Sequence, residues 1–181
     1  MPEQKLKNFL HQNMSEPPKD FDGRVHLHLA RLVAKEEPKM KVNEIMSGRV
    51  ICIGQDEPVS AAAKMLKRSN IGALPVCDAS HRLRGIVTDR DIVTRCVALD
   101  ADPAETRVAE IMSRGVLTAS PLDEVSHAAH IMRTDQVRRL PVLDEGKLVG
   151  MVTLCDIARD GKYDMEAAEA LADISANLRR T

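Results

Sequence analysis

Two short stretches of this chain place a threonine three residues before an aspartate, directly after a run of apolar residues. Thr88 precedes Asp91, and Thr153 precedes Asp156. Each pattern predicts a strand that ends at the threonine and a helix that begins near the aspartate. A phosphate could bind the unpaired N–H groups of such a helix start and the threonine hydroxyl, while the carboxylate accepts from a diol such as ribose. Both residue types are also good helix caps, and capping alone would account for them.

The two stretches belong to an internal repeat with an offset of 66 residues. The sequence Val-Asn-Glu-Ile-Met-Ser at 42–47 is answered by Val-Ala-Glu-Ile-Met-Ser at 108–113, and Leu-Pro-Val at 74–76 recurs at 140–142. Between residues 41 and 78, 14 of 38 positions are identical at this offset. A signal of this strength indicates a duplicated structural unit.

Each copy has the pattern of a β-α-β-β-α unit. Apolar residues at helical spacing predict the long helix, and short apolar runs bounded by turn residues predict the strands. In the first copy we expect a helical turn ending at 46–47, an extended segment at 50–53, a helix at 58–69, strands around 74–76 and 85–88, and a helix from Asp91 onward.

We divide the chain into four parts. An apolar stripe at 165–178, with Leu171, Ile174 and Leu178 on one side, predicts a further helix that packs on the repeats or on a second subunit. A helix is also expected at 22–37, where Pro38 ends it. The expected parts are an N-terminal, partly helical extension (1–40), repeat one (41–100), repeat two (107–160) and a C-terminal helical part (161–181).

Composition argues against several classes of protein. The net charge of −1 and the aromatic content of 2% disfavour nucleic-acid binding, which uses basic patches and stacking side chains. No apolar run approaches the roughly 18–20 residues of a membrane span, and the N-terminus lacks the apolar core of a signal peptide. The four cysteines show no C-x-x-C spacing, so we expect a cytoplasmic protein with reduced thiols and no membrane contact.

Catalytic and metal-binding motifs are weak. His26 and His28 would point apart on a helix, whereas His127 and His130 could share a helix face and bind a metal with a third ligand. The first copy has no histidine at the positions that match His127 and His130. No phosphate-binding P-loop and no Ser/His/Asp or Cys/His set emerges. We therefore expect neither an enzyme nor a metal site.

The duplicated pattern resembles the CBS-domain pair, or Bateman module, over residues 41 to about 160. The resemblance rests on both Glu-Ile-Met-Ser openings, on the segments 70–76 and 136–142, and on both Gly-x-Val-Thr-x-x-Asp strands. Segment 70–77 followed by 88–93 looks like the stand-alone bacterial proteins of this family. The resemblance implies an α+β fold of α/β type, in which two repeats pack around a pseudo-twofold axis.

The resemblance also implies an adenine nucleotide (AMP, ADP, ATP) or a related adenosyl ligand in two clefts, with no required cofactor. Each aspartate would bind ribose hydroxyls, and each threonine with its helix start would face phosphate. Carried over by position, the first cleft would use Thr88, Asp91, Cys52, Ile71 and Ala73, and the second would use Thr118, Val137, Arg139, Thr153 and Asp156.

Two differences between the copies make the clefts unequal. The family often has a threonine or serine at the start of the first strand; repeat two has Thr118 there, and repeat one has Cys52, a weaker hydrogen-bond partner. Repeat two also carries Arg138 and Arg139, which either favour phosphate or form surface or inter-subunit salt bridges. On these grounds we expect the second cleft to be the better nucleotide site.

The family fold would bring Cys52 close to Cys77, where a disulfide is possible but free thiols are commoner in cytosolic proteins. The expected function is a non-enzymatic regulatory sensor, homodimeric as a disc of four repeats, that acts on a protein partner not identified by the sequence. Two alternatives remain open. One is a ligand-free structural or interaction protein that acts through dimerisation, and the other is a metal- or redox-responsive stress protein.

Overall fold

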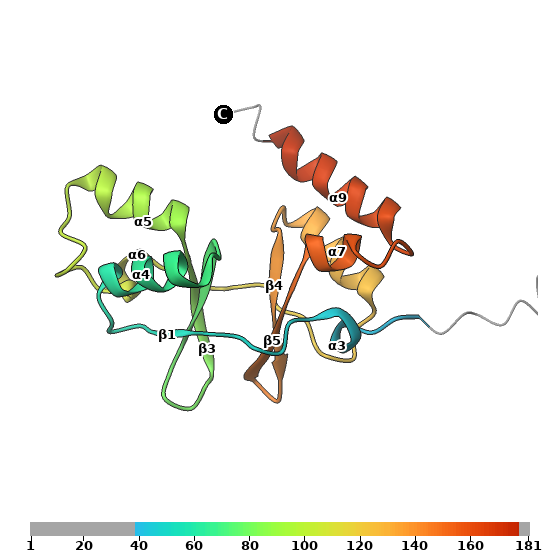
Figure 1. Ribbon diagram of the computed structural model, residues 1–181, viewed down its shortest axis with the longest axis horizontal. Helices are drawn as coiled ribbons and strands as arrows, with labels where there is room; N and C mark the ends of the chain where they lie inside the picture. The colour runs from blue at the N-terminus through green and yellow to red at the C-terminus, as the bar shows by residue number, and fades with distance from the viewer. Residues whose placement is uncertain (1–38, 178–181) are drawn as a thin grey trace, which may run out of the picture. The chain divides into compact units, whose positions relative to one another are not determined.

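The computed structural model describes residues 39–177, so the helix expected at 22–37, with His26 and His28, lies outside the described residues. None of the described helices is long and apolar enough to cross a membrane. The elements, which Figure 1 shows in order, are α3 (Val42–Ile45), β1 (Ile53–Gly54), α4 (Val59–Ser69), β2 (Ala73–Cys77), β3 (Leu83–Thr88), α5 (Asp89–Arg95), the 3₁₀ turn η1 (Val97–Leu99), α6 (Val108–Ile111), α7 (Val125–Thr134), β4 (Arg139–Asp144), β5 (Lys147–Thr153), α8 (Leu154–Ala158) and α9 (Asp164–Asn177).

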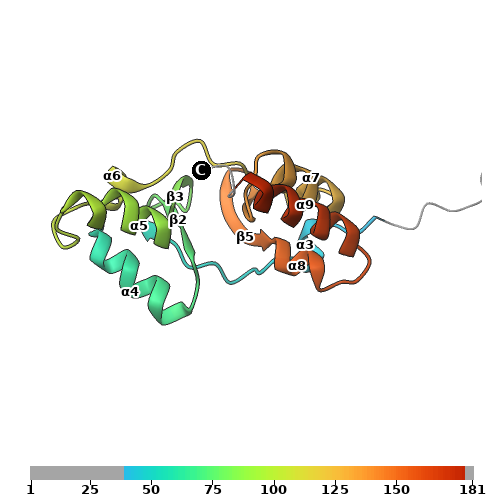
Figure 2. The same ribbon diagram turned by 90° about the horizontal axis from the view of Figure 1, so that it is seen from above.

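The strands form one small sheet in each repeat. In repeat one the order is β1-β2-β3, with β1 parallel and β3 antiparallel to β2. In repeat two β4 and β5 form an antiparallel pair, and the counterpart of the extended segment 50–53, at 116–119, is reduced to a single parallel bridge from Ala119 to Val142. The helices α4 and α5 flank the first sheet, and α7 and α8 flank the second (Figure 2). The mixed α and β fold expected for the duplicated unit is thus confirmed.

The first short helix of each repeat packs on the other repeat. Val42 donates its backbone N–H to the Asp123 carbonyl at 2.9 Å, and Ser47 pairs with Met151 of β5 in an antiparallel bridge. In Figure 1 the blue helix α3 accordingly lies beside the orange elements of repeat two. Val42 is fully buried and belongs to the same apolar core as α7, β4 and β5.

The reciprocal contact places α6 on repeat one. Ser113 pairs with Ile86 of β3, and their backbone N–H to carbonyl distances are 2.8 and 3.0 Å. Val108 and Ile111 are buried in the core formed by α4, β2 and β3. The apolar core of each repeat is therefore completed by the short first helix of the other repeat.

At each of these contacts a methionine of one repeat packs on a glycine of the other repeat. A Cβ atom on Gly85 would approach the Ser113 carbonyl oxygen to 2.7 Å and the Met112 sulfur to 2.9 Å. A Cβ atom on Gly150 would likewise overlap the sulfur of Met46. Real Cβ contacts below about 3.0 Å are essentially absent, so a larger residue at Gly85 would displace the Ser113 backbone, and one at Gly150 would displace the Met46 side chain.

Helix α9 packs on α7 and α8 of repeat two through Ala167, Ala170 and Ile174, which are buried in its core. Their spacing of three and four residues defines the packed stripe. Leu171 is 52% exposed, so it lies outside the side of α9 that packs on α7 and α8. Small alanines made that stripe hard to recognise from the sequence, because apolar bulk pointed to Leu171 instead.

All four cysteines are free thiols in this structure. The parallel pairing of β1 and β2 sets Gly54 opposite Cys77, which brings Cys52 next to Cys77. Burial, followed by the charge and hydrogen bond of Cys52, raises the pKa of Cys77 to about 12. Cys155 is exposed at the surface.

Val42→Ala should destabilise the protein even though Val42 lies outside the repeat whose core it fills. We expect the free energy of unfolding to fall by about 2 kcal/mol, because buried methyl groups are lost and a cavity remains. The matched control Val93→Ala, at a side chain that is 57% exposed on α5, should change it by less than about 0.5 kcal/mol. Urea unfolding measures both, and equal losses would contradict the proposed role of α3.

The raised pKa of Cys77 predicts slow alkylation in the native protein. At pH 8 a thiol with a pKa of about 12 is thiolate in only about one molecule in ten thousand, and the thiolate is the nucleophile. Iodoacetamide followed by peptide mass spectrometry should therefore find Cys155 modified well before Cys77. Comparable rates at these two positions in folded protein would refute the assignment.

Candidate functional site

Thr88 and Asp91 form a reciprocal cap at the start of α5. The Thr88 hydroxyl accepts from the Asp91 N–H at 3.1 Å, and Asp91 Oδ2 accepts from the Thr88 N–H at 2.9 Å and from its hydroxyl at 2.6 Å. The extended backbone of Thr88 (φ −118°, ψ 164°) makes this geometry possible. The helix start expected near Asp91 is thus found at Asp89.

Thr153 and Asp156 repeat this cap at the start of α8. Asp156 Oδ2 accepts from the Thr153 N–H at 2.9 Å and from its hydroxyl at 2.6 Å. In both copies one carboxylate oxygen is therefore committed to the cap, and Oδ1 is the oxygen that remains for another partner.

The Oδ1 atoms of Asp91 and Asp156 each have an arginine partner, and the two arginines differ in how many other bonds hold them. Arg95 lies 3.3 Å from Asp91 Oδ1 and is anchored by bonds to the Ile111 carbonyl at 2.8 Å and the Ser113 hydroxyl at 3.1 Å. The Asp91 carboxylate is therefore held from both sides, and the residue is only 8% exposed.

Asp156 Oδ1 also lies 3.3 Å from an arginine, Arg159, but that side chain is 79% exposed and bonds to no other group in residues 39–177 that the structure shows. Exposed ion pairs contribute little free energy, so Arg159 can leave at small cost. Asp156 is consequently the aspartate that a ligand can reach.

Asp156 and Thr153 line a cleft of about 360 Å³, which we call the Thr153 cleft. Its apolar walls come from repeat one, where Ile51 and Ile71 are about 40% exposed although they are large and aliphatic. A cleft of this size suits a small molecule. The complete lining is Ser47, Arg49, Val50, Ile51, Ser69, Ile71, Ala73, Pro75, Arg139, Met151, Thr153 and Asp156.

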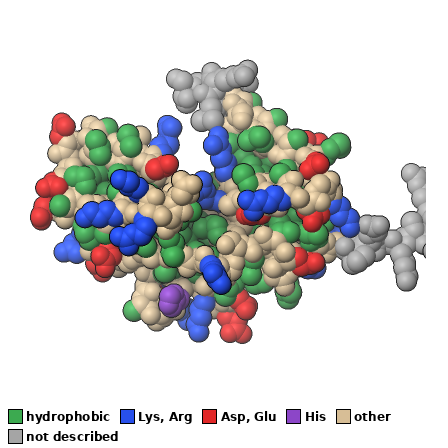
Figure 3. All heavy atoms as spheres, viewed as in Figure 1, with side chains coloured by type: hydrophobic (Ala, Val, Ile, Leu, Met, Phe, Trp, Pro, Cys, Tyr) green, Lys and Arg blue, Asp and Glu red, His purple; other side chains and the backbone are tan. Residues whose placement is uncertain are grey.

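Thr88 lines a second cleft of about 700 Å³, which we call the Thr88 cleft. Most of its lining residues correspond, at the repeat offset in the sequence, to residues that line the Thr153 cleft, so the two clefts are related by the internal symmetry. The difference is charge, because four arginines surround this cleft: Arg90, Arg114, Arg138 and Arg139. Lys and Arg side chains border the hollow between the repeats on the face in Figure 3.

The predicted site residues are grouped differently from the expectation. Ile71 and Ala73 lie with Thr153 and Asp156, whereas Val137 lies with Thr88, so each cleft joins the Thr-x-x-Asp motif of one repeat to the strand entry of the other. The grouping by repeat was wrong because α3 and α6 cross over and carry the following segments with them.

Other predicted residues also occupy unexpected places. Asp91, Cys52 and Thr118 line neither cleft, and Arg138 lies in the Thr88 cleft and not near Thr153. Arg139 lines both clefts. The argument that the arginine pair strengthens the Thr153 cleft therefore holds for Arg139 alone.

Sequence reasoning missed Arg49, Arg90 and Arg114 as lining residues. A signal for two of them was present: in both copies an arginine and a glycine, in either order, follow the Glu-Ile-Met-Ser opening, as Gly48-Arg49 and Arg114-Gly115. Glycine beside arginine at a strand entry is typical of a segment that approaches an anion closely.

No group of three or more His, Cys, Asp or Glu side chains within residues 39–177 is placed to hold a metal ion. His127 and His130 are both exposed on α7. Within the described residues, the only side-chain hydrogen-bond contact of either ring joins His130 Nε2 to the Thr134 hydroxyl, at 3.5 Å. These histidines therefore contribute to neither cleft.

The chain is similar to several stand-alone proteins. Hypoxic response protein 1 of Mycobacterium tuberculosis is 39% identical over 116 residues, which are 64% of this chain and 81% of that protein. The CBS domain-containing protein YhcV of Bacillus subtilis is 35% identical over 134 residues, 74% of this chain and 94% of that protein.

Solved structures show the same arrangement. The crystal structure of Hypoxic Response Protein I with two coordinated zinc ions has a TM-score of 0.62 at 38% identity, and covers 66% of this chain and 98% of its own. The CBS domain pair of protein MJ0100, in complex with 5′-methylthioadenosine and S-adenosyl-L-methionine, has a TM-score of 0.63 at 33% identity, and covers 70% and 99%.

The sequence profile of the CBS domain matches this chain twice, over residues 42–98 and 108–161. These matches include both Thr-x-x-Asp caps, both Glu-Ile-Met-Ser openings and the strands that carry the clefts. Together with the exchanged short helices and the two symmetry-related clefts, they show that the chain belongs to the CBS-domain family and carries two tandem CBS repeats.

Proposed function

We propose that this protein is a non-enzymatic regulatory module that binds an adenine nucleotide or a related adenosyl ligand between its two CBS repeats. The observation that carries the proposal is the Thr153 cleft, in which a reachable carboxylate faces aliphatic walls from the other repeat. The MJ0100 pair, which holds 5′-methylthioadenosine and S-adenosyl-L-methionine, supports the adenosyl class of ligand.

The chemistry of the Thr153 cleft fits the parts of a nucleoside. Ile51, Ile71 and Pro75 offer an apolar slot for the faces of a flat base, in a protein with few aromatic side chains. Asp156 Oδ1 accepts from ribose hydroxyls once Arg159 moves aside, and hydrogen bonds to a charged group are worth about 1.5–3 kcal/mol each. Binding that differs between two arrangements of the repeats would then shift their populations.

Phosphate binding falls to the arginines. Arg139, on β4, is the only arginine in the described part of the chain that lines both clefts. Its counterpart in repeat one is Ala73, which carries no charge. Guanidinium groups bind phosphate oxygens in a bidentate manner. We therefore assign the base and ribose to the Thr153 cleft and expect phosphates to extend toward Arg139.

A ligand-free interaction protein is the main alternative, and a homodimer is the assembly we expect in either case. The two functions differ in one measurable respect, because a ligand that binds only the native state must raise the melting temperature. AMP, ADP, ATP and S-adenosyl-L-methionine in a thermal-shift series separate them, and no shift with any of the four would favour the alternative.

Asp156→Asn should weaken nucleotide binding without removing the cap of α8. The amide oxygen still accepts from Thr153, but the charged acceptor for ribose is lost, so we expect about a tenfold to hundredfold rise in the Kd for AMP. Isothermal titration calorimetry measures it. The matched variant Asp91→Asn, at an aspartate that faces neither cleft, should change the Kd less than about twofold. Equal losses of AMP affinity in the two variants would contradict the assignment of Asp156 to the ribose.

Arg139→Ala should weaken ATP more than adenosine, because only ATP carries charge for the guanidinium to bind. We expect about a tenfold or larger loss for ATP and less than about a twofold loss for adenosine. Arg68→Ala, on the exposed surface of α4 outside both clefts, is the control for a general change in charge. Parallel losses for the two ligands would show that Arg139 acts on structure and not on phosphate.

A further inference from the structure

The Thr88 cleft has an excess of positive charge that the assignment of base and ribose to the Thr153 cleft does not use. Its lining contains four arginines but one carboxylate, that of Asp89, which leaves a formal excess of three positive charges in a chain whose net charge is −1. Neutral donors stand beside the arginines, namely the hydroxyls of Thr88 and Ser113 and the amide of Gln136. A lining of this composition fits an anion that carries several negative charges.

Three of these arginines have no competing partner among the described residues. Arg90, Arg138 and Arg139 form no ion pair or hydrogen bond with any group in the range 39–177. Arg114 donates one guanidinium N–H to the Ala109 carbonyl at 3.2 Å, and a guanidinium has five such donors. An anion that enters the Thr88 cleft therefore breaks no salt bridge of these arginines.

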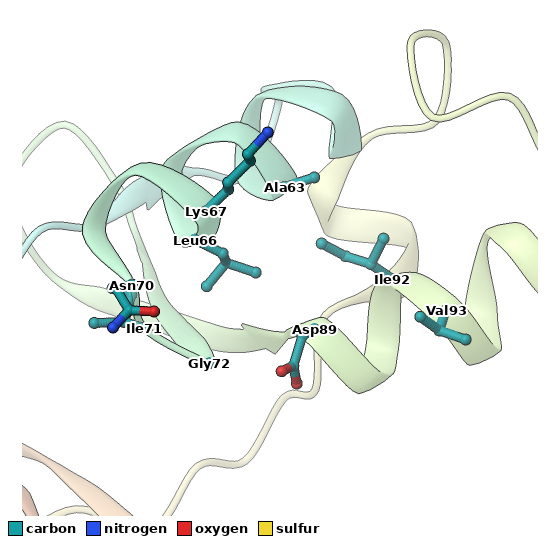
Figure 4. A pocket seen from close by; sticks show the side chains of 9 residues that line it. All are labelled: Ala63, Leu66, Lys67, Asn70, Ile71, Gly72, Asp89, Ile92 and Val93. Carbon is teal, nitrogen blue, oxygen red and sulfur yellow. The ribbon is translucent and has the colours of Figure 1, made fainter.

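The entry to β2 forms a wall that both clefts share, because alternate residues of this segment line different clefts. Ile71 and Ala73 line the Thr153 cleft, whereas Gly72 between them lines the Thr88 cleft. Figure 4, a view of the neighbouring pocket between α4 and α5, shows Gly72 between Ile71 and the Asp89 side chain. Here a single segment of backbone separates the two clefts.

The Arg139 guanidinium lies against this wall. A Cβ atom placed on Gly72 would be 3.6 and 3.7 Å from the two terminal nitrogens of Arg139, and 3.4 Å from Asp89 Oδ2. Asp89 forms no ion pair with Arg139 although both lie beside Gly72 in the described part of the chain. The guanidinium thus stands where the two clefts meet, which accounts for its place in the lining of both.

One guanidinium carries one positive charge, so it cannot attract two anions with full strength. The first phosphate to bind Arg139 neutralises that charge. A phosphate that arrives in the other cleft then meets a neutral pair, with the negative charge of the first phosphate behind it. Because coupling between two binding sites is reciprocal, each anion weakens the binding of the other by the same factor.

We propose that Arg139 couples the two clefts antagonistically, with an oligophosphate group as the ligand of the Thr88 cleft. The proposal rests on the proposed function, which puts the phosphate of a nucleotide in the Thr153 cleft next to Arg139. An oligophosphate held by the arginines of the Thr88 cleft takes up the Arg139 guanidinium, and a mononucleotide such as AMP then binds the Thr153 cleft less tightly. The Thr88 cleft thereby sets the AMP concentration to which the Thr153 cleft responds.

Calorimetric titration of AMP into the full chain, with and without inorganic triphosphate at constant ionic strength, tests the coupling. We expect triphosphate to raise the Kd for AMP about fivefold or more and then to reach a plateau. Competition of both compounds for one site would instead raise the Kd in proportion to the triphosphate concentration. The Kd for adenosine, which has no phosphate, should change less than about twofold.

Two arginine variants locate the coupling. In Arg139→Ala, AMP should bind with the same Kd whether or not triphosphate is present. Arg138→Ala is the matched control, because Arg138 lines the Thr88 cleft but not the Thr153 cleft. It should require more triphosphate for the same effect, while the rise in the Kd for AMP at saturation should equal that of the parent chain. Arg139→Gln repeats the test if circular dichroism shows that Arg139→Ala does not fold.

The oligophosphate could be inorganic or the end of a nucleotide, and a second titration distinguishes these sources. Triphosphate and GTP are titrated separately into the Asp156→Asn chain, in which the Thr153 cleft is weakened. Equal Kd values support recognition of the phosphates alone, and tighter binding of GTP supports a site for the phosphates of a nucleotide. Binding of neither compound would overturn the proposal.

Three further results would also overturn the proposal: an AMP Kd that saturating triphosphate leaves unchanged, an equal effect on adenosine, or a coupling that survives in Arg139→Ala. The first of these, with AMP bound normally, removes the coupling and leaves the proposed function intact. A parent chain that does not bind AMP at all would instead remove the proposed function, and the coupling with it.

Discussion

The packing of one methionine on one glycine, made twice, is the contact on which the rest of the structure depends. Met112 lies on Gly85 and Met46 on Gly150, each across the boundary between the repeats. Because the methionine ends a short helix whose other apolar residues are buried in the same foreign core, neither repeat has a complete core of its own. A side chain at Gly85 would push the Ser113 backbone away from the strand, and one at Gly150 would displace the Met46 side chain.

The clefts are a direct consequence of this exchange. The segment after α3 must leave repeat two to reach β1, and it passes the start of α8 on the way, which places Ile51 beside Thr153 and Asp156. The segment after α6 passes the start of α5 in the same manner. A Thr-x-x-Asp cap therefore always faces backbone from the other repeat, and a ligand in either cleft contacts both repeats at once. Such a ligand can bias how the repeats sit against each other, which a ligand held within one repeat cannot do.

The sequence predicted local features well and spatial groupings poorly. The offset of 66 residues, the strands around Leu74 and Leu140, and helices starting beside Thr88 and Thr153 all depend on neighbouring residues, and all are present. Which strand entry faces which cap depends on the exchange of α3 and α6, and no local pattern reports that exchange. The side of α9 that packs on repeat two was missed for a related reason: its alanines are buried because α7 and α8 approach closely, while the larger Leu171 stays 52% exposed.

The two repeats share one fold, but the residues at which they differ give each repeat its own charges and packing. Arg95 is anchored by the Ile111 carbonyl, whereas Arg159 bonds only to Asp156 in the described residues, and Asp156 lines a cleft that Asp91 does not. Arg139 stands where repeat one has Ala73 and lines both clefts, while α9 packs on the helix pair α7 and α8 of repeat two. The Gly72 carbonyl accepts the Asp89 N–H at 3.3 Å and both residues line the Thr88 cleft, so a displacement of this wall also moves the start of α5. A duplicated fold can in this way keep both caps and both clefts while each cleft carries a different set of charges, with four arginines around one and two in the other.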